Sequence, residues 1–95
     1  MLIDKGIAAG EVVSIKLSNG DEIIGRLESE SADEIKIEKP LAITIGPQGL
    51  GMMPWMFLSA RDVYSLKKIH VYAMQPSKKE AADQYMQGTT GIALR

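Results

Sequence analysis

The chain has 95 residues, which is enough for one domain with a modest core. Its formal net charge of −1 excludes a generic, strongly basic phosphate-coating protein, so any nucleic-acid binding has to come from a few placed residues. The sequence contains no cysteine and a single histidine, His70, and therefore predicts neither a disulfide framework nor a metal site.

The N-terminal segment and the hydropathy of the chain indicate where the protein resides. No apolar run reaches the roughly 18 residues that a transmembrane helix needs, so no membrane span is expected. Residues 1–10 lack the basic start and apolar core of a signal peptide, and Gly6 and Gly10 disfavour a helix there. We therefore expect an irregular lead-in over residues 1–10 and a cytoplasmic protein without a membrane partner.

Residues 11–30 predict two strands joined by a tight turn. Apolar and polar residues alternate over 11–17, which is the pattern of a strand with one buried face. Asn19-Gly20 accepts positive φ and favours a hairpin turn before a second strand at 22–30. Gly25 lies inside that second strand, where glycine usually marks a sharp bend or a close backbone approach. A small closed barrel requires such a bend.

The next expected strand, 34–45, is interrupted by Pro40. Proline cannot donate to a strand ladder, so Pro40 is predicted at a bulge or at an unpaired edge position. The glycine-rich segment 46–51 predicts a loop. Beyond it we expect an apolar strand at 52–59, a connector at 60–66 and a fifth strand at 67–75.

The pattern changes to a helical period near the C-terminus. Ser77 and Glu80 form a capping-box pattern, and Gly88 supplies a stop signal. These signals predict a short helix over 78–87, which has to pack against other elements because a helix of that length is marginal alone. Residues 89–95 are expected to form a loosely held tail.

Together these elements predict a mostly β protein: a small, strongly bent antiparallel barrel of five strands with a short C-terminal helix. The expected organisation is a lead-in at 1–10, the barrel at 11–76, and the helix and tail at 77–95. The pattern V-x-I-x-L-x-N-G-x-x-I-x-G-x-L, from Val13 to Leu27, resembles the first motif of the Sm-like proteins (Sm, LSm and Hfq). This resemblance implies an Sm-like barrel, with an SH3-like or OB-type barrel as the alternative.

The chain departs from that family in its base-reading motifs. In the family, an Asp followed by a Met-Asn pair comes after the second strand, and the asparagine reads uridine. Here Asp33 is followed by residues 34–37 without an asparagine, and Arg61 precedes an aspartate where the family has Arg-Gly. Lys67-Lys68 is similar to the Lys-His pair of the Hfq-like branch. The chain thus resembles a divergent member, of the kind that some bacteriophages carry.

The resemblance implies a homo-oligomeric ring that binds single-stranded RNA near its pore and needs no cofactor. The expected RNA-binding residues are Asp33, Arg61, Tyr64, Lys67 and Lys68. A solvated turn explains any one of these charges as well, but a ring would repeat each of them around the pore. The alternative is a structural ring that binds protein partners and no nucleic acid. The sequence presents no nucleophile–base pair or phosphate loop, so we expect no enzyme.

The resemblance also implies how subunits would meet. In the family, strand four of one subunit pairs with strand five of the next and closes a ring. The apolar segment 52–59 would invite aggregation if its edge were bare, which favours such self-association. The expected interface residues are Met53, Trp55, Phe57, Ile69 and Val71. Packing is the expected role of Trp55, with base stacking as the alternative.

Overall fold

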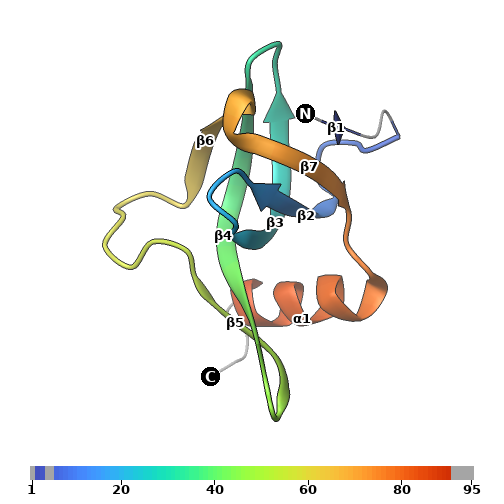
Figure 1. Cartoon of the computed structure of the whole chain (residues 1–95), viewed down its shortest axis with the longest axis vertical. Coiled ribbons are helices and arrows are strands. Elements are labelled where there is room, and N and C mark those ends of the chain that lie inside the picture. Colours follow the sequence, from blue (N-terminus) through green and yellow to red (C-terminus); the bar gives the residue numbers. More distant parts are fainter. Residues whose placement is uncertain (1, 4–5, 91–95) are drawn as a thin grey trace.

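The computed structural model describes residues 2–3 and 6–90, which form a strongly bent, mostly antiparallel sheet and one helix (Figure 1). The strands are β1 (Leu2–Ile3), β2 (Val12–Leu17), β3 (Glu22–Glu30), β4 (Glu34–Gly46), β5 (Gly49–Pro54), β6 (Val63–Lys67) and β7 (Val71–Pro76). A single 3-10 turn, η1 (Lys68–His70), separates β6 from β7, and α1 (Lys79–Thr90) follows. The mostly β architecture with a C-terminal helix confirms the predicted fold class.

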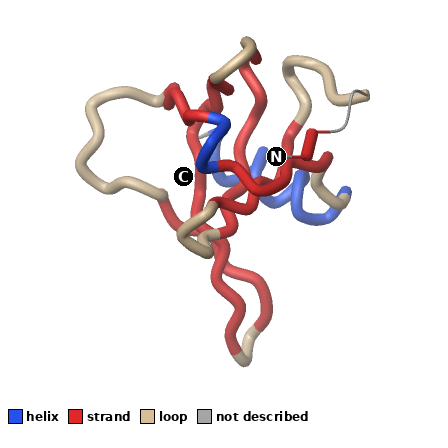
Figure 2. Tube along the Cα trace, turned by 45° about the horizontal axis from the view of Figure 1, so that its top comes forward, coloured by secondary structure: helices blue, strands red, loops and turns tan. Residues whose placement is uncertain are grey.

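The longest strand, β4, pairs with two neighbours along one edge. The strand order is β1-β7-β2-β3-β4-β5, and β6 also pairs with β4. The first half of β4 pairs with β6 and the second half pairs with β5, so these two short strands follow each other along the same edge. Figure 2 shows the resulting shape, in which the β4–β5 hairpin projects away from the curled part of the sheet.

The hairpin of β2 and β3 has the predicted form. Gly20 adopts a φ of +98°, and the Asp21 N–H donates to Asn19 Oδ1 at 2.9 Å, as an asparagine-led turn does. The Leu17 N–H closes the turn on the Asp21 carbonyl oxygen at 2.9 Å. Strand β3 covers the predicted residues 22–30. The local sequence therefore fixes the register of the first two barrel strands.

Gly25 lies at the bend of β3, as predicted. Ile24 pairs with Leu41 whereas Arg26 pairs with Glu38, so Gly25 faces two residues of β4 instead of one. These two residues are 39 and 40, and the predicted bulge at the proline is confirmed. A Cβ atom on Gly25 would lie only 2.3 Å from the Cγ2 of Ile37, so β3 and β4 approach at this point more closely than any side chain allows.

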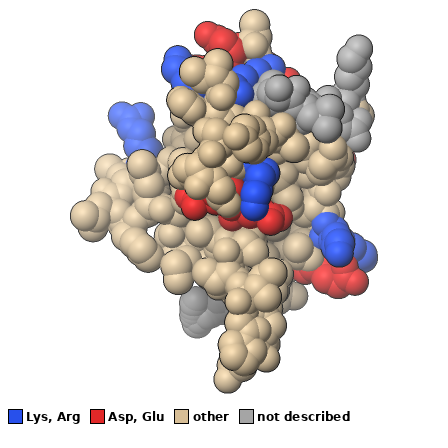
Figure 3. Space-filling view, in the orientation of Figure 1, with Lys and Arg blue, Asp and Glu red and all other residues tan. Residues whose placement is uncertain are grey.

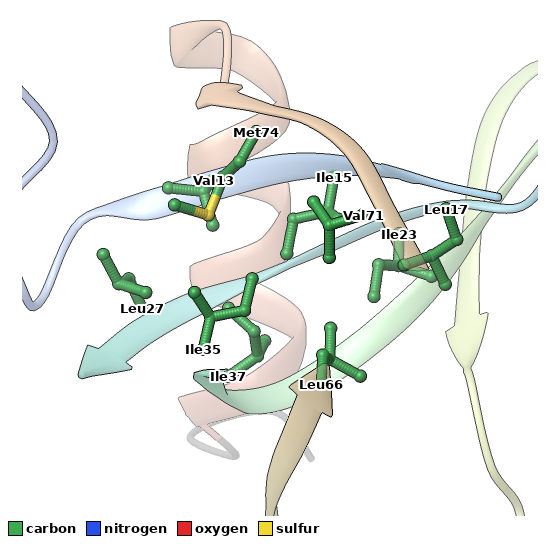
Figure 4. Packing of buried hydrophobic residues seen from close by; sticks show 10 residues of the cluster. All are labelled: Val13, Ile15, Leu17, Ile23, Leu27, Ile35, Ile37, Leu66, Val71 and Met74. Atoms are coloured by element: carbon green, nitrogen blue, oxygen red, sulfur yellow. The ribbon is translucent and has the colours of Figure 1, made fainter. Parts of the chain in front are cut away.

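The core lies inside the curl and is built by the alternating apolar residues of five strands (Figure 4). Its members are Val13, Ile15, Leu17, Ile23, Leu27, Ile35, Ile37, Leu66, Val71 and Met74. Ile24 is also fully buried but points to the opposite face of β3, where α1 covers it. On that side Tyr85 is 1% exposed, and its hydroxyl donates to the Glu38 carbonyl oxygen. The helix is thus a second, smaller layer over the outer face of the barrel.

The structure corrects the predicted strands in the second half of the chain. Strand β5 begins at Gly49, within the predicted loop, and ends at Pro54, so the predicted strand at 52–59 is wrong over most of its length. Residues 55–62 form an open loop instead. Strand β6 lies in the predicted connector, and η1 interrupts the predicted strand at 67–75. The described residues therefore include seven strands where five were expected. One strand that was not predicted is β1, which lies in the predicted lead-in.

The helix is longer than predicted, and its capping is different. The Ala82 N–H donates to the Lys78 carbonyl oxygen at 2.9 Å, which makes Lys78 the N-cap residue. The Ser77 hydroxyl instead bonds to the Ser14 hydroxyl at 2.8 Å and ties the helix start to β2. Gly88 continues the helix rather than ending it, and the Thr89 hydroxyl donates back to the Tyr85 carbonyl oxygen. Of the predicted tail, residues 91–95 lie outside the described part of the chain.

Candidate nucleic-acid interface

Three of the five predicted RNA-binding residues meet at one end of the β4–β6 ladder. Lys67 of β6 pairs with Glu34 of β4, and the Lys68 N–H donates to the Asp33 carbonyl oxygen at 2.9 Å. The turn between β3 and β4 and the turn after β6 therefore lie against each other. The structure thus brings Asp33, Lys67 and Lys68 together although they are far apart in sequence.

The other two predicted residues lie elsewhere. Arg61 precedes β6 and is six residues from Lys67, which is about 20 Å along an extended strand. Tyr64 lies in the middle of β6, with its ring centroid 6.0 Å from that of Trp55 and the ring planes inclined by 53°. Tyr64 therefore supports Trp55, and Arg61 belongs to a different part of the surface.

The clustered lysines are paired with carboxylates. Lys67 Nζ lies 3.0 Å from Glu34 Oε2, and Lys68 Nζ lies 2.8 Å from Glu30 Oε2. The hydrogen bond to Glu34 and the attraction of its charge raise the pKa of Lys67. The pairing of Glu30 and Glu34 with these lysines was not predicted from the sequence. No local sequence signal could have found it, because it depends on the β4–β6 register.

These two ion pairs differ in how accessible they are. The side chain of Lys67 is 61% exposed, whereas that of Lys68 is 16% exposed. An exposed ion pair contributes little free energy, because water and salt screen it. Lys67 can therefore exchange Glu34 for a phosphate at small cost, and Lys68 serves mainly to hold the two turns together.

A pocket of about 240 Å³ lies next to Lys67. It is lined by Leu17, Ser18, Asn19, Trp55, Leu66, Lys67 and His70. One wall is the half-buried Trp55, whose Nε1–H donates to Asp21 Oδ2 at 3.2 Å and which packs against the core. An indole wall with nearby hydroxyl, amide and imidazole groups suits a planar base, which stacks on an aromatic face and bonds through its edge.

The pocket joins segments that are separated in sequence. The Ser18 N–H donates to the His70 carbonyl oxygen at 2.8 Å, which holds η1 against the β2–β3 turn. His70 is exposed at the end of η1, whereas the sequence predicted that it lies in a strand over 67–75. Trp55 reaches the pocket from the loop after β5. Sequence reasoning missed the roles of Ser18, Asn19 and His70, because only the folded β2–β3 turn places them beside Trp55.

The predicted interface residues do not share one strand edge. Met53, Phe57 and Ile69 are exposed, and Phe57 and Ile69 lie outside the strands, in the loop 55–62 and in η1. Val71 is a correction: its side chain is 2% exposed inside the core, so it is not available to a partner. Strand β7 can contribute its main chain there, but not the Val71 side chain.

The described part of the chain, residues 2–3 and 6–90, holds no group of three or more histidine, aspartate or glutamate residues arranged to bind a metal ion. Within the same ranges, the length and apolar character of a membrane-crossing helix are not reached. Figure 3 shows that the charged side chains on this face are scattered, most of them in small groups of both signs, while the β4–β5 hairpin at the bottom carries none. The face is therefore not a continuous basic surface.

No model of a known protein family matches the chain, and no curated protein is similar to it by sequence. Among solved structures, it is similar to the crystal structure of a heptameric archaeal Sm protein, which was discussed for its implications for the eukaryotic snRNP core. The TM-score is 0.52 at 20% sequence identity, and the match covers 74% of this chain and 90% of that chain. This likeness supports the interpretation of the Val13–Leu27 motif. The protein has an Sm-like fold.

Proposed function

We propose that this protein forms a homo-oligomeric Sm-like ring that binds single-stranded RNA. The observation that carries the proposal is the Trp55-walled pocket beside the exposed Lys67. The similar archaeal Sm protein is a heptamer, which supports the ring. Because the net charge is −1, binding would depend on placed contacts that the ring repeats, and not on overall basicity.

The main chain of β6 has an open edge that supports assembly. The Lys39 N–H donates to the Asp62 carbonyl oxygen and the Lys68 N–H donates to that of Asp33, and these two bonds flank the β4–β6 ladder. In an antiparallel ladder the main-chain groups of alternate residues point to the same side. The N–H of Ser65 therefore points away from β4, toward the open edge. Strand β7 offers a complementary edge, on which β1 covers Ala73 and Met74.

Replacing Ser65 with proline is expected to break the ring and leave the subunit folded. The change removes a donor on the open edge of β6, and proline is tolerated at an edge position when its missing N–H faced outward. Light scattering should show monomers, with an unchanged circular dichroism spectrum. Ser65→Ala is the matched control, because it changes the side chain and keeps the N–H. A ring that survives Ser65→Pro would contradict pairing through β6.

RNA would be held by stacking and by a phosphate contact. A base stacks on Trp55, with an expected contribution of about 1–3 kcal/mol. Lys67 turns from Glu34 to a phosphate, and Ser18, Asn19 and His70 line the rest of the pocket. Asp33 positions Lys68 through its main-chain carbonyl group. The expected selectivity is for single strands, because only unpaired bases can be splayed onto an aromatic wall.

Fluorescence polarisation with short oligo-U and oligo-A RNA, over a salt series, tests this proposal. We expect binding that weakens as salt rises, with a smaller salt dependence in Lys67→Ala. Lys79→Ala is the matched control, because Lys79 also forms an exposed ion pair, with Asp83 at 2.8 Å, but lies on α1. Trp55→Leu should weaken binding about tenfold, in line with the loss of one stacked base. No binding at tens of micromolar protein in low salt would contradict RNA recognition.

A structural ring that binds protein and no RNA is the second candidate function. The pairing of Lys67 and Lys68 with glutamates favours it, because the cations expected to meet phosphate are already neutralised. An intact ring without any salt-dependent RNA binding would select this alternative.

A further inference from the structure

The loop formed by residues 55–62, called the arm here, projects from the barrel between β5 and β6 (Figure 1, left). It presents three apolar side chains to solvent: Met56 is 51% exposed, Phe57 is 72% exposed and Leu58 is 98% exposed. Residues 41–60 contain no charged side chain at all. Apolar side chains that protrude together in this way mark an interaction site, because a monomer gains nothing by exposing them.

A groove of about 610 Å³ lies on another part of the same molecule. It runs between the start of α1, the outer face of β2 and β3, and the β4–β5 hairpin. Its apolar lining is provided by Ile24, Ile43, Ile45, Leu50, Pro76 and Ala81. Ile45 is 81% exposed and Leu50 is 40% exposed, so the hairpin wall of the groove is as uncovered as the arm.

We infer that the arm of one subunit lies in the groove of the next subunit. The inference rests on the proposed ring and adds the residues that fix its geometry. Antiparallel pairing of β6 with a neighbouring β7 places Val63 opposite the end of β7 at Pro76, which lines the groove. Leu58 is five residues before Val63 and can reach at most about 17 Å beyond that point. The arm therefore extends toward the neighbouring groove.

The groove is lined by Glu22, Glu80 and Lys78 and so carries a net negative charge, and the arm carries Arg61 and Asp62. Arg61, the only basic residue of the arm, forms none of the ion pairs found among residues 6–90. Glu22 and Glu80 line the groove, and neither of them takes part in those ion pairs. The guanidinium group has a rigid fork of donors that suits a carboxylate. A second copy of this chain thus supplies both the apolar side chains and the cation that the groove fits.

The direction in which β6 pairs with the neighbouring β7 decides which surface of the next subunit the arm reaches. Parallel pairing would instead carry the arm toward η1 of the next subunit, where Ile69 is 82% exposed. Antiparallel pairing is the commoner and slightly more stable arrangement. It is also the one that brings the apolar side chains of the arm to a hairpin wall without charged residues.

Disulfide cross-linking tests the inference directly, because the natural chain has no cysteine. The variant carrying Leu58→Cys and Lys78→Cys places one thiol on the arm and one at the groove, both at exposed positions. After mild oxidation, a non-reducing gel should show a ladder of covalent multimers. Each single-cysteine variant can form only arm-to-arm or groove-to-groove dimers. If neither single variant yields dimers, a ladder from the double variant requires bonds between arm and groove.

The variant carrying Leu58→Cys and Ile69→Cys is the matched control, and it should not produce the ladder. A ladder from that pair in place of the first would overturn the inference and establish parallel pairing. Light scattering on the reduced proteins separates the two levels of the proposal. If light scattering shows a ring but the gel shows no arm-to-groove ladder, the inference about the arm is contradicted and the ring is not. If light scattering shows a monomer, the proposed ring is contradicted as well.

Discussion

Replacing Gly25 with alanine is expected to lower the free energy of unfolding by about 3 kcal/mol, as overpacking of a filled core does. The added Cβ would lie 2.3 Å from Ile37 Cγ2 and 3.2 Å from the Glu38 carbonyl oxygen. Ile37 is fully buried and cannot move aside without displacing its neighbours. Urea unfolding followed by circular dichroism measures the loss.

Gly88→Ala is the matched control for this prediction. Gly88 lies inside α1, and nothing is within 4 Å of the position that its Cβ would take. The same substitution there should raise the free energy of unfolding by up to about 1 kcal/mol, because alanine favours helices over glycine. Equal losses at both positions would contradict the close approach of β3 and β4. If only Gly88→Ala lowers the free energy of unfolding, the helix ends at Gly88, as the sequence predicted.

The second large effect is a loss of stability in alkaline solution that depends on Tyr85. Burial raises the pKa of Tyr85 to about 12, from 10.0. The folded state thus favours the protonated hydroxyl, and this contribution is complete below pH 10 and disappears as the pH rises through 12. Two pKa units correspond to about 2.7 kcal/mol. The free energy of unfolding should therefore fall by about 2 to 3 kcal/mol between pH 10 and pH 12 through this group.

The variant Tyr85→Phe should show a flatter pH dependence, because it has no hydroxyl to ionise. It should also be less stable than the natural protein at neutral pH, since the Glu38 carbonyl oxygen loses its donor. Tyr72→Phe is the control: Tyr72 is 63% exposed and should keep the alkaline loss. Chemical unfolding at several pH values measures all three proteins. The same slope in Tyr85→Phe and in the natural protein would contradict this role of Tyr85.

The first half of the fold could be predicted because its signals are local. Asn19-Gly20 fixes a turn by its own conformational preferences, and the alternation over 11–17 fixes which face is buried. Gly25 predicted a close approach between two segments but not which residue it would face. The structure shows that this residue is Ile37. These residues carry the Sm-like resemblance, so the family could be suggested from about 15 residues.

The second half could not be predicted, because the choice of partner is not local. The segment 49–59 is apolar throughout, and its sequence does not show that β4 pairs with β5 and β6 in succession. Pro54 marks the end of β5, which lies at an edge of the sheet. The same limit holds for the candidate site: Asp33 and Lys68 were each predicted to bind RNA, but neither the hydrogen bond between them nor the ion pair of Lys68 with Glu30 was predicted.

Strand β1 would make formation of the proposed ring depend on protein concentration. It pairs with Ala73 and Met74 of β7, on the edge that a neighbouring β6 would use. Ring closure is then a strand exchange in which an incoming subunit displaces a tethered segment of two residues. The tether competes at a fixed local concentration, whereas the neighbour competes at the concentration of the protein in solution. If the proposed ring forms, β1 would cover the β7 edge in dilute subunits, and a neighbouring β6 would replace it in concentrated ones.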